Sequence, residues 1–285
     1  MTLADVAQAH GLRRVGGRPP LGSYLTDVWR RREFIYALAK YRIEAENGRN
    51  RLGMAWVVLK PLMNAAVYGV VFGLLLRTNR GVDDFVAFLV IGVLMFEYFS
   101  TCLTTGAKSI TGSAALVQSL SFPRMSLPLS LVVQRLLQFV PMAVIMAIVA
   151  VCLGNLPSWE WLLFIPLTVI FTVFNVGITL CTARLTVHFR DLTQLLPFVS
   201  RFLLYGTGVF FSLEQRLEDH PTAQAILDWQ PIHEFLTLAR AILLDGPMYE
   251  IRGEYFALAS FWAVVMIVIG TVFFWAAEER YGRDD

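Results

Sequence analysis

Long apolar runs alternate with short polar links along this chain. The first run, from Gly53 to Leu76, contains about 24 residues. At about 1.5 Å per residue its helix would be about 36 Å long, enough to cross a hydrocarbon core of about 30 Å with some tilt. The pattern predicts an all-α integral membrane protein with six transmembrane helices. Their approximate bounds are 53–76, 85–107, 129–153, 161–183, 192–212 and 255–277.

The segment before the first span is polar and basic. Residues 1–22 hold arginines, glycines and prolines, so we expect a flexible cytoplasmic tail there. Within residues 23–50, the apolar side chains between Tyr24 and Glu46 recur at helical spacing among lysines and arginines. This pattern predicts an N-terminal amphipathic interface helix on the membrane surface. The alternative is a positively charged anchor with no further role. Residues 51–285 would form the six-span domain.

Lysine and arginine are concentrated before the first span. Ten of the chain's 24 lysines and arginines lie there. Such an excess marks the cytoplasmic side of a membrane protein. We therefore expect the N-terminus in the cytoplasm, and an even number of spans returns the C-terminus to the same side. The segment 213–254, between the fifth and sixth spans, then lies outside and is rich in acidic residues.

The outer segment contains a short apolar run, Ile232–Leu244, of about 13 residues. A run of this length is too short to span and is typical of a re-entrant or interfacial helix. We interpret residues 210–244 as re-entrant outer helices that cap the outer mouth of a cavity. The alternative is a solvent-exposed loop with one surface helix.

Composition supports the membrane class and excludes several chemistries. The chain is 56% hydrophobic and 16% charged, whereas soluble domains are about 45–50% apolar and about 25% charged. Three cysteines lie in apolar stretches, so no disulfide framework is expected. The histidines lack metal-ligand spacing, and no GxxxxGK[ST] phosphate loop occurs. We expect no metal, no cofactor on this chain and no nucleic-acid partner.

Four ionisable residues interrupt the apolar spans: Lys60, Glu97, Arg135 and Arg201. The three cations lie about 9–14 Å from the cytoplasmic ends of their spans at helical rise, and Glu97 lies at a similar depth. Charges inside spans are costly and mark ion pairs or pathways. One interpretation is a pair between Glu97 and Arg135 or Lys60. The other is that the cations bind an anionic headgroup entering from the cytoplasmic leaflet.

Aromatic and polar residues recur on one face of two spans. Asn64, Tyr68 and Phe72 repeat every four residues on the first span, beyond Trp56, and Tyr205 follows Arg201 on the fifth. Aromatic faces with polar neighbours suit stacking against sugar rings. Ordinary helix packing and interfacial aromatic belts are the alternative. We predict a substrate channel lined by Trp56, Asn64, Tyr68, Phe72 and Tyr205.

Four short motifs occur in order along the chain. They are Arg51-Leu52-Gly53 with Trp56 and Leu59-Lys60-Pro61-Leu62; Phe122-Pro123-Arg124 with Leu127-Pro128-Leu129; Phe189-Arg190-Asp191-Leu192; and Gln230-Pro231 with Ala239-Arg240. Together they resemble the membrane (permease) subunit of polysaccharide ABC exporters of the ABC-2 type, the Wzm, KpsM and TagG (TarG) group. The sequence departs from that pattern at Gln230, where the family usually has Asn.

The resemblance implies a homodimer joined to two copies of a separate ABC ATPase subunit, which would hold ATP and Mg. This chain would not itself be an enzyme. Its substrate would be a polyprenyl-pyrophosphate-linked glycan of O-antigen, teichoic acid or galactan type. It would act in contact with membrane lipid, as a multi-pass protein of the plasma (inner) membrane of a bacterium, with both termini cytoplasmic.

The resemblance also suggests residue roles. Phe122, Pro123, Arg124, Arg190 and Asp191 would receive the ATPase stroke. Phe210, Phe211, Pro231 and Phe235 would form the outer gate. With this substrate, the anionic headgroup that we expect at Lys60, Arg135 and Arg201 would be the entering lipid pyrophosphate.

Three other functions remain open at this point. An ABC-2 permease for a small hydrophobic drug or lipid would share the fold but need no long aromatic path. A channel or ion-coupled transporter would need no ATPase partner. An integral membrane glycosyl- or acyltransferase would need a nucleophile or paired acids at the surface, and none is recognised in the sequence.

Overall fold

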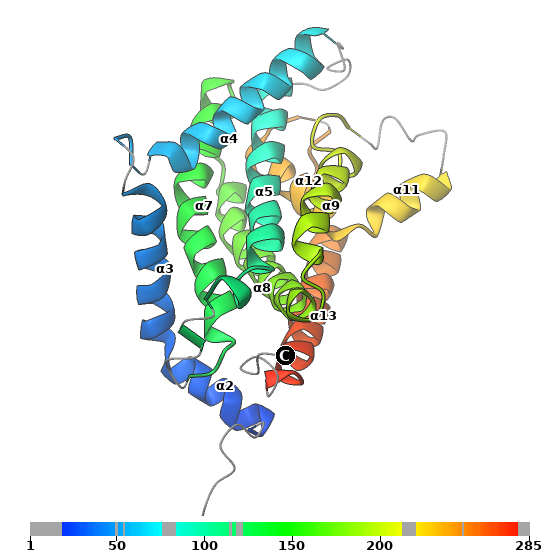
Figure 1. Ribbon diagram of the computed structural model, residues 1–285. Coiled ribbons are helices and arrows are strands. Elements are labelled where there is room, and N and C mark those ends of the chain that lie inside the picture. Colours follow the sequence, from blue (N-terminus) through cyan, green and yellow to red (C-terminus); the bar gives the residue numbers. More distant parts are fainter. Residues whose placement is uncertain are drawn as a thin grey trace, which may run out of the picture.

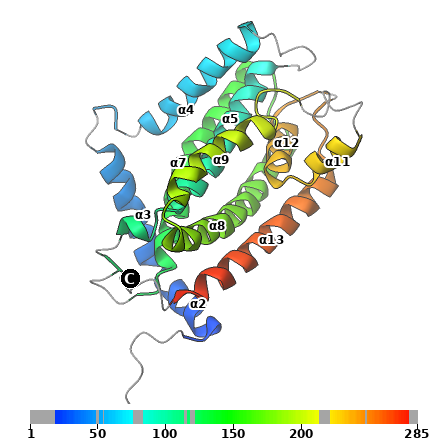
Figure 2. The same ribbon diagram turned by 45° about the vertical axis from the view of Figure 1, so that its right-hand side comes forward.

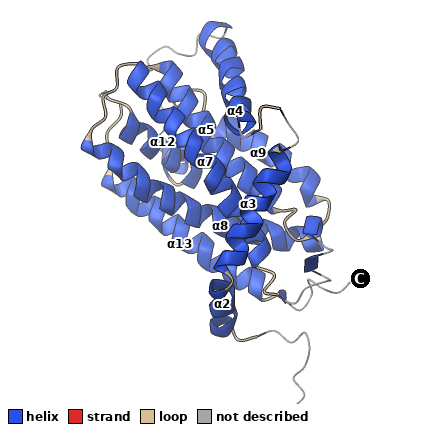
Figure 3. Cartoon of the chain, turned by 90° about the vertical axis from the view of Figure 1, so that its left-hand side faces the viewer, coloured by secondary structure: helices blue, strands red, loops and turns tan. Residues whose placement is uncertain are grey.

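The computed structural model describes residues 19–48, 51–53, 55–75, 84–113, 116–117, 122–212, 221–246 and 248–278. Within these ranges every regular element is a helix (Figures 1 and 3). Five helical segments there have the length and apolar composition to cross a membrane: Ala55–Phe72, Phe85–Gly106, Ser126–Cys152, Trp159–His188 and Gly253–Trp275. The predicted all-α class and five of the predicted spans therefore have matching helices.

The predicted fifth span, 192–212, is shorter than expected. Helix α9 (Leu192–Gly206) has 15 residues and ends before Gly208, which has a left-handed φ of 74°. At about 1.5 Å per residue it is about 22 Å long, less than the hydrocarbon thickness of about 30 Å. The predicted span was too long because its apolar run continues past Gly206, where the helix ends, into the turn at Gly208. The described residues thus contain five helices of membrane length, and the shorter α9 lies where the fifth span was predicted.

The predicted single N-terminal helix is two helices. Helix α2 (Leu21–Arg30) and helix α3 (Arg32–Asn47) are separated by Arg31, whose ψ of 19° departs from helical geometry. The break changes the direction of the chain. Tyr24 and Val28 of α2 pack with Phe274 in a cluster that Ile35, in the first turn of α3, also joins. The rest of α3 runs alongside α7 (Figure 1). Two helices therefore stand where one continuous helix was predicted, and their position on the membrane surface stays a prediction.

Helix α5 (Phe85–Gly106) is the centre of the molecule. It packs against α7 (Ser126–Cys152), α8 (Phe164–His188), α9 and α12 (Pro231–Leu243). Of its apolar stretch, 78% is buried inside the chain, against 11% for the first predicted span. That span consists of α4 (Ala55–Tyr68) and a π-helical continuation, Gly69–Leu75, and it crosses one face of the bundle obliquely (Figures 1 and 2).

Helix α13 (Gly253–Trp275) lies beside α8 along much of its length (Figure 2). A Cβ on Gly177 of α8 would collide with the backbone of Met266, and one on Gly270 of α13 would lie 2.5 Å from the carbonyl oxygen of Gly177. The two glycines therefore allow the backbones to touch. A short 3-10 helix, Trp159–Leu163, leads into α8, and another, Thr111–Ser113, follows α5.

The described part of the predicted outer segment, residues 221–246, packs against the bundle through α12. Helix α11 (Pro221–Asp228) precedes α12, which begins at Pro231, where a missing N–H costs nothing. All residues of α12 from Ile232 to Leu243 are buried except Thr237. The alternative of an exposed surface helix was therefore wrong. Whether α12 reaches membrane depth as a re-entrant helix stays a prediction.

Candidate functional site

Two adjoining hollows lie beneath α4. The wide hollow has a volume of about 400 Å³ and is bounded by α4, α5 and α9. The narrow hollow has a volume of about 180 Å³ and is bounded by α3, α4, α5 and α7. Glu97 of α5 lines both. They adjoin the face of α5 that α4 covers, so a ligand in either would contact three or four helices.

The wide hollow has hydroxyl, amide, carboxyl and cationic groups among its apolar lining residues. Its polar lining consists of Asn64 and Tyr68 from α4, Glu97, Ser100, Thr104, Thr105 and Lys108 from α5 and its end, and Ser200 and Arg201 from α9. Ser100 and Ser200 share a hydrogen bond of 2.6 Å across α5 and α9, and Thr104 donates to the Ser100 carbonyl at 2.7 Å. Because a hydroxyl keeps a further lone pair after such a bond, these groups can still bind a polar ligand.

A cluster of aromatic rings lies beyond this hollow. Phe210 is fully buried and meets three predicted channel residues: Tyr68 at 4.7 Å, Phe72 at 4.4 Å and Tyr205 at 5.4 Å between ring centroids. The sequence placed Phe210 in the outer gate and the other three in the channel. The structure joins them in one cluster between α4 and the end of α9.

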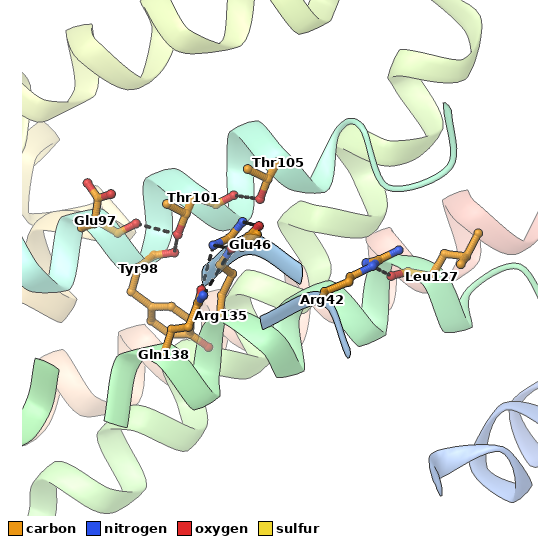
Figure 4. Close-up of polar contacts among 9 residues, drawn as sticks. All are labelled: Arg42, Glu46, Glu97, Tyr98, Thr101, Thr105, Leu127, Arg135 and Gln138. Carbon is orange, nitrogen blue, oxygen red and sulfur yellow. Dashed lines mark hydrogen bonds and ion pairs between the residues drawn. The ribbon is translucent and has the colours of Figure 1, made fainter. Parts of the chain in front are cut away.

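The expected ion pair of Glu97 is absent from the described residues. Arg135 instead pairs with Glu46 of α3, with 3.0 Å between Nη2 and Oε1. The Glu97 carboxylate points away from Arg135 (Figure 4). Lys60 stands over the Trp56 ring, 6.0 Å from its centroid. The predicted cations are thus divided: Lys60 and Arg135 line the narrow hollow, and Arg201 lines the wide one.

The motif Phe122-Pro123-Arg124 lies where three distant parts of the chain meet. Phe122 packs against Phe34 of α3 at 5.4 Å between ring centroids. The side chain of Arg124 donates to the main-chain carbonyl of Glu278, and its main-chain N–H donates to Oε1 of Glu278 at 3.1 Å. Tyr24 of α2 donates to Oε2 of the same carboxylate at 2.7 Å. We call Tyr24, Arg124 and Glu278 the terminal node.

Burial raises the pKa of Glu278, while its bonds from Tyr24 and Arg124 act in the opposite direction. The sequence predicted Arg124 as a coupling residue but missed Tyr24 and Glu278. Neither lies in a motif, and their partners are more than 100 residues away along the chain. The remaining coupling residues, Arg190 and Asp191, are exposed between α8 and α9 beside Phe189, which is 68% exposed.

The other predicted gate residues occupy different surroundings. Phe235 is fully buried and packs against Phe171 and Phe174 of α8, at 4.5 and 5.5 Å between ring centroids. Pro231 starts α12, and Phe211 lies beside a small hollow near Arg240. Phe235 therefore contacts the protein core and not the hollows, and its role in gating stays a prediction.

Arg240 of α12 links the start of α5 to the turn after α9. Its guanidinium donates to the carbonyl oxygens of Phe88 at 3.2 Å, Gly208 at 3.0 Å and Val209 at 3.0 Å. It also stacks on the Phe88 ring, 3.4 Å from the centroid. Since Gly208 and Val209 directly precede Phe210, Arg240 positions the centre of the ring cluster. From the sequence, Arg240 was recognised only as part of a motif, and its role in positioning Phe210 was not predicted.

The region from α3 to α12 matches a known family. A profile described as ABC-2 type transporter covers residues 34–244 of this chain. The chain is a member of the ABC-2 type transporter family. This membership establishes a membrane subunit of a transporter, with the two hollows and the ring cluster inside the matched region.

Individual ABC-2 relatives cover most of the chain. An O-antigen export system permease protein RfbA of Myxococcus xanthus is 26% identical over 87% of this chain and 94% of its own length. A protein of the same name from Klebsiella pneumoniae is 25% identical over 81% of this chain and 87% of its own length. The polysialic acid transport protein KpsM of Escherichia coli is 20% identical, over 86% and 93% respectively.

Proposed function

We propose that this ABC-2 subunit is the permease of an ATP-driven exporter that moves a lipid-pyrophosphate-linked polysaccharide out of a bacterial cell. It would act in the plasma membrane with both termini in the cytoplasm, as a homodimer with two ABC ATPase subunits. An O-antigen-type glycan is favoured by the names of its relatives, with teichoic acid and galactan types as further members of the substrate class.

The observation that carries this proposal is the lining of the wide hollow. Its polar groups include Asn64, Ser100, Thr104, Ser200 and Arg201, and the ring cluster lies directly beyond them. Sugars bind through hydroxyl hydrogen bonds and stacking on aromatic faces. A small hydrophobic drug, the alternative substrate, would leave these hydroxyl, amide and guanidinium groups without hydrogen-bond partners, which is costly in a site shielded from water.

The exposed surfaces of α4 and α9 support a larger assembly. Leu59, Met63, Val67 and Val70 of the first span, and Phe198 and Phe202 of α9, are all exposed in the single chain. Phe202 has 78% of its surface exposed. In a membrane these side chains meet lipid or a second copy, and a homodimer built on them would enclose the wide hollow between subunits.

Depleting this chain in its native bacterium tests the function. We expect surface glycan to fall and lipid-linked glycan to accumulate inside the cell, measured in separated membrane and surface fractions. Wild-type chain supplied in trans should restore export. Unchanged surface glycan, with altered retention of hydrophobic dyes, would favour the drug or lipid permease. Co-purification of an ATP-hydrolysing subunit with the tagged chain tests the partner.

A further inference from the structure

The pair between Glu46 and Arg135 has the geometry of a bound anion. Nη1 and Nη2 of Arg135 donate to both carboxylate oxygens of Glu46, at 3.3 and 3.0 Å. Gln138, one turn along α7, accepts from Nη1 at 2.7 Å and donates to Glu46 at 3.3 Å (Figure 4). Three donors from α7 thus converge on one carboxylate supplied by α3.

We propose that Glu46 occupies the place of a substrate diphosphate on Arg135 and Gln138, and that an entering lipid diphosphate displaces it. This inference rests on the proposed function and identifies where the charged group of that substrate binds. A phosphate presents two oxygens to a guanidinium as a carboxylate does, and carries more charge. The donor set therefore accepts either group.

The narrow hollow has unused capacity for such a ligand. The Nε of Arg135 is buried and has no hydrogen-bond partner among the described residues. Lys60 lines the same hollow, and in the described structure no carboxylate forms an ion pair with it. Glu46 has only two oxygens, whereas a diphosphate has several terminal oxygens. A diphosphate in this hollow would have both Arg135 and Lys60 among its lining residues.

The Glu46 side chain can leave without unfolding its surroundings. It lies on the last turn of α3, and 45% of it is exposed, against 15% for Arg135. Water can therefore reach Glu46 as it leaves, whereas the more buried Arg135 needs another anion in its place. The same exchange would separate the end of α3 from α7. Phe34 at the start of α3 packs against Phe122, two residues before Arg124 of the terminal node. A ligand in the narrow hollow that displaces α3 would therefore also displace Phe122.

The test measures binding of farnesyl diphosphate to the purified full chain, with its co-purifying ATPase subunit, by titration calorimetry in detergent. Glu46→Gln removes the competing charge and should tighten binding by about two- to five-fold, the range expected for releasing an exposed ion pair. Glu44→Gln removes the same charge from the same exposed helix and should leave the Kd unchanged. Arg135→Gln should weaken binding by about ten-fold or more.

Further ligands distinguish the source of the anion. Inorganic pyrophosphate should compete with farnesyl diphosphate, and farnesol should not. Nanodiscs of phosphatidylglycerol that compete equally well would show a general lipid-headgroup site and overturn the diphosphate assignment. An unchanged or weaker Kd in Glu46→Gln, including one accompanied by a lower Tm, would make Glu46 a structural partner only and overturn the proposal.

The binding test of the Glu46 proposal can fail independently of the depletion test of the proposed function. If depletion leaves surface glycan unchanged, the proposed function fails whatever the Kd values are. If depletion traps glycan inside the cell while Glu46→Gln binds like wild type, only the placement of the diphosphate fails.

Discussion

Gly92 of α5 leaves the space that the guanidinium of Arg240 fills. A Cβ at Gly92 would collide with Nη2 of Arg240 and lie 3.2 Å from the carbonyl oxygen of Val209. Arg240 is held by three carbonyl oxygens and cannot swing away without breaking those bonds. The absence of one methyl group on α5 is therefore a condition for the position of α12.

Gly92→Ala should consequently destabilise the protein by about 1–3 kcal/mol, the range for overpacking a filled interior. The measurement is the thermal midpoint of the purified chain in detergent. Gly22→Ala is the matched control, because nothing lies within 4 Å of a Cβ at that position and alanine favours helix α2. Equal midpoints for Gly92→Ala and wild type would contradict the packing described.

Gly177→Ala should be the more damaging glycine substitution. Its Cβ would meet the backbone of Met266 and lie 2.7 Å from the Ile267 nitrogen. Backbone atoms in the middle of α13 cannot rotate aside as a side chain does, so α8 and α13 must separate. We expect less folded protein in the membrane than for Gly92→Ala, measured by size-exclusion chromatography. The reverse order would show that α13 yields more easily than Arg240.

Tyr68→Ala and Phe72→Ala should impair glycan export more than assembly. Each loses a ring contact with Phe210, worth about 0.5–1.5 kcal/mol beyond the buried area. Val264→Ala, at an exposed position on α13 away from the proposed dimer surface, is the control. The measurement compares surface glycan with the amount of chain in the membrane. Wild-type export by both ring variants would assign these residues to packing alone.

Glu278→Ala should reduce the glycan exported per ATP hydrolysed. It removes the carboxylate that accepts from the buried Tyr24 hydroxyl and from the Arg124 N–H, and the loss of these bonds should cost about 1–3 kcal/mol. The loop containing Phe122 and Arg124 would then move without the rest of the chain. Glu160→Ala, exposed in the link before α8, is the charge-matched control. An unchanged ratio would remove the terminal node from coupling.

Glu234→Gln should make stability less dependent on pH. Burial, with a smaller contribution from Asp228, raises the pKa of Glu234 from its ordinary 4.5 to about 8. Neither carboxylate oxygen has a hydrogen-bond partner in the described structure. A raised carboxyl pKa means that the stabilisation present below pH 4.5 is lost as pH rises through about 8.

Thermal midpoints measured from pH 5 to about 9 in detergent test this prediction. Wild type should lose stability towards the alkaline end, and Glu234→Gln should lose less there. Glu254→Gln, exposed at the start of α13, should follow wild type. A parallel decline in wild type and Glu234→Gln would assign the alkaline loss to other groups.

Run length and composition were sufficient to predict the helical class, because a bilayer requires helices of a fixed length. They were insufficient at Arg31 and Gly208, where a change in one residue's backbone angles ends a helix while the apolar pattern continues. Periodicity reports which face is apolar but not whether one helix or two present it.

The sequence also predicted the cations of the narrow hollow but not what pairs with Arg135. One interpretation paired Glu97 with Arg135 or Lys60, because all three residues lie in apolar spans. Glu46 lies outside the predicted spans and 89 residues from Arg135 along the chain. Only the packing of α3 against α7 brings them together, and no local pattern encodes that contact. Arg240 was missed as a positioning residue for the same reason.

The unequal burial of α5 and α4 has a consequence for how this transporter can evolve. Most of α5 is enclosed, so substitutions there disturb the packing of several helices at once. The first span has only 11% of its length buried in the chain, yet it carries Asn64, Tyr68 and Lys60. Changes in α4 can therefore alter the lining of the hollows at little cost in folding. New substrate preferences should arise by mutation of α4 while α5 stays constant.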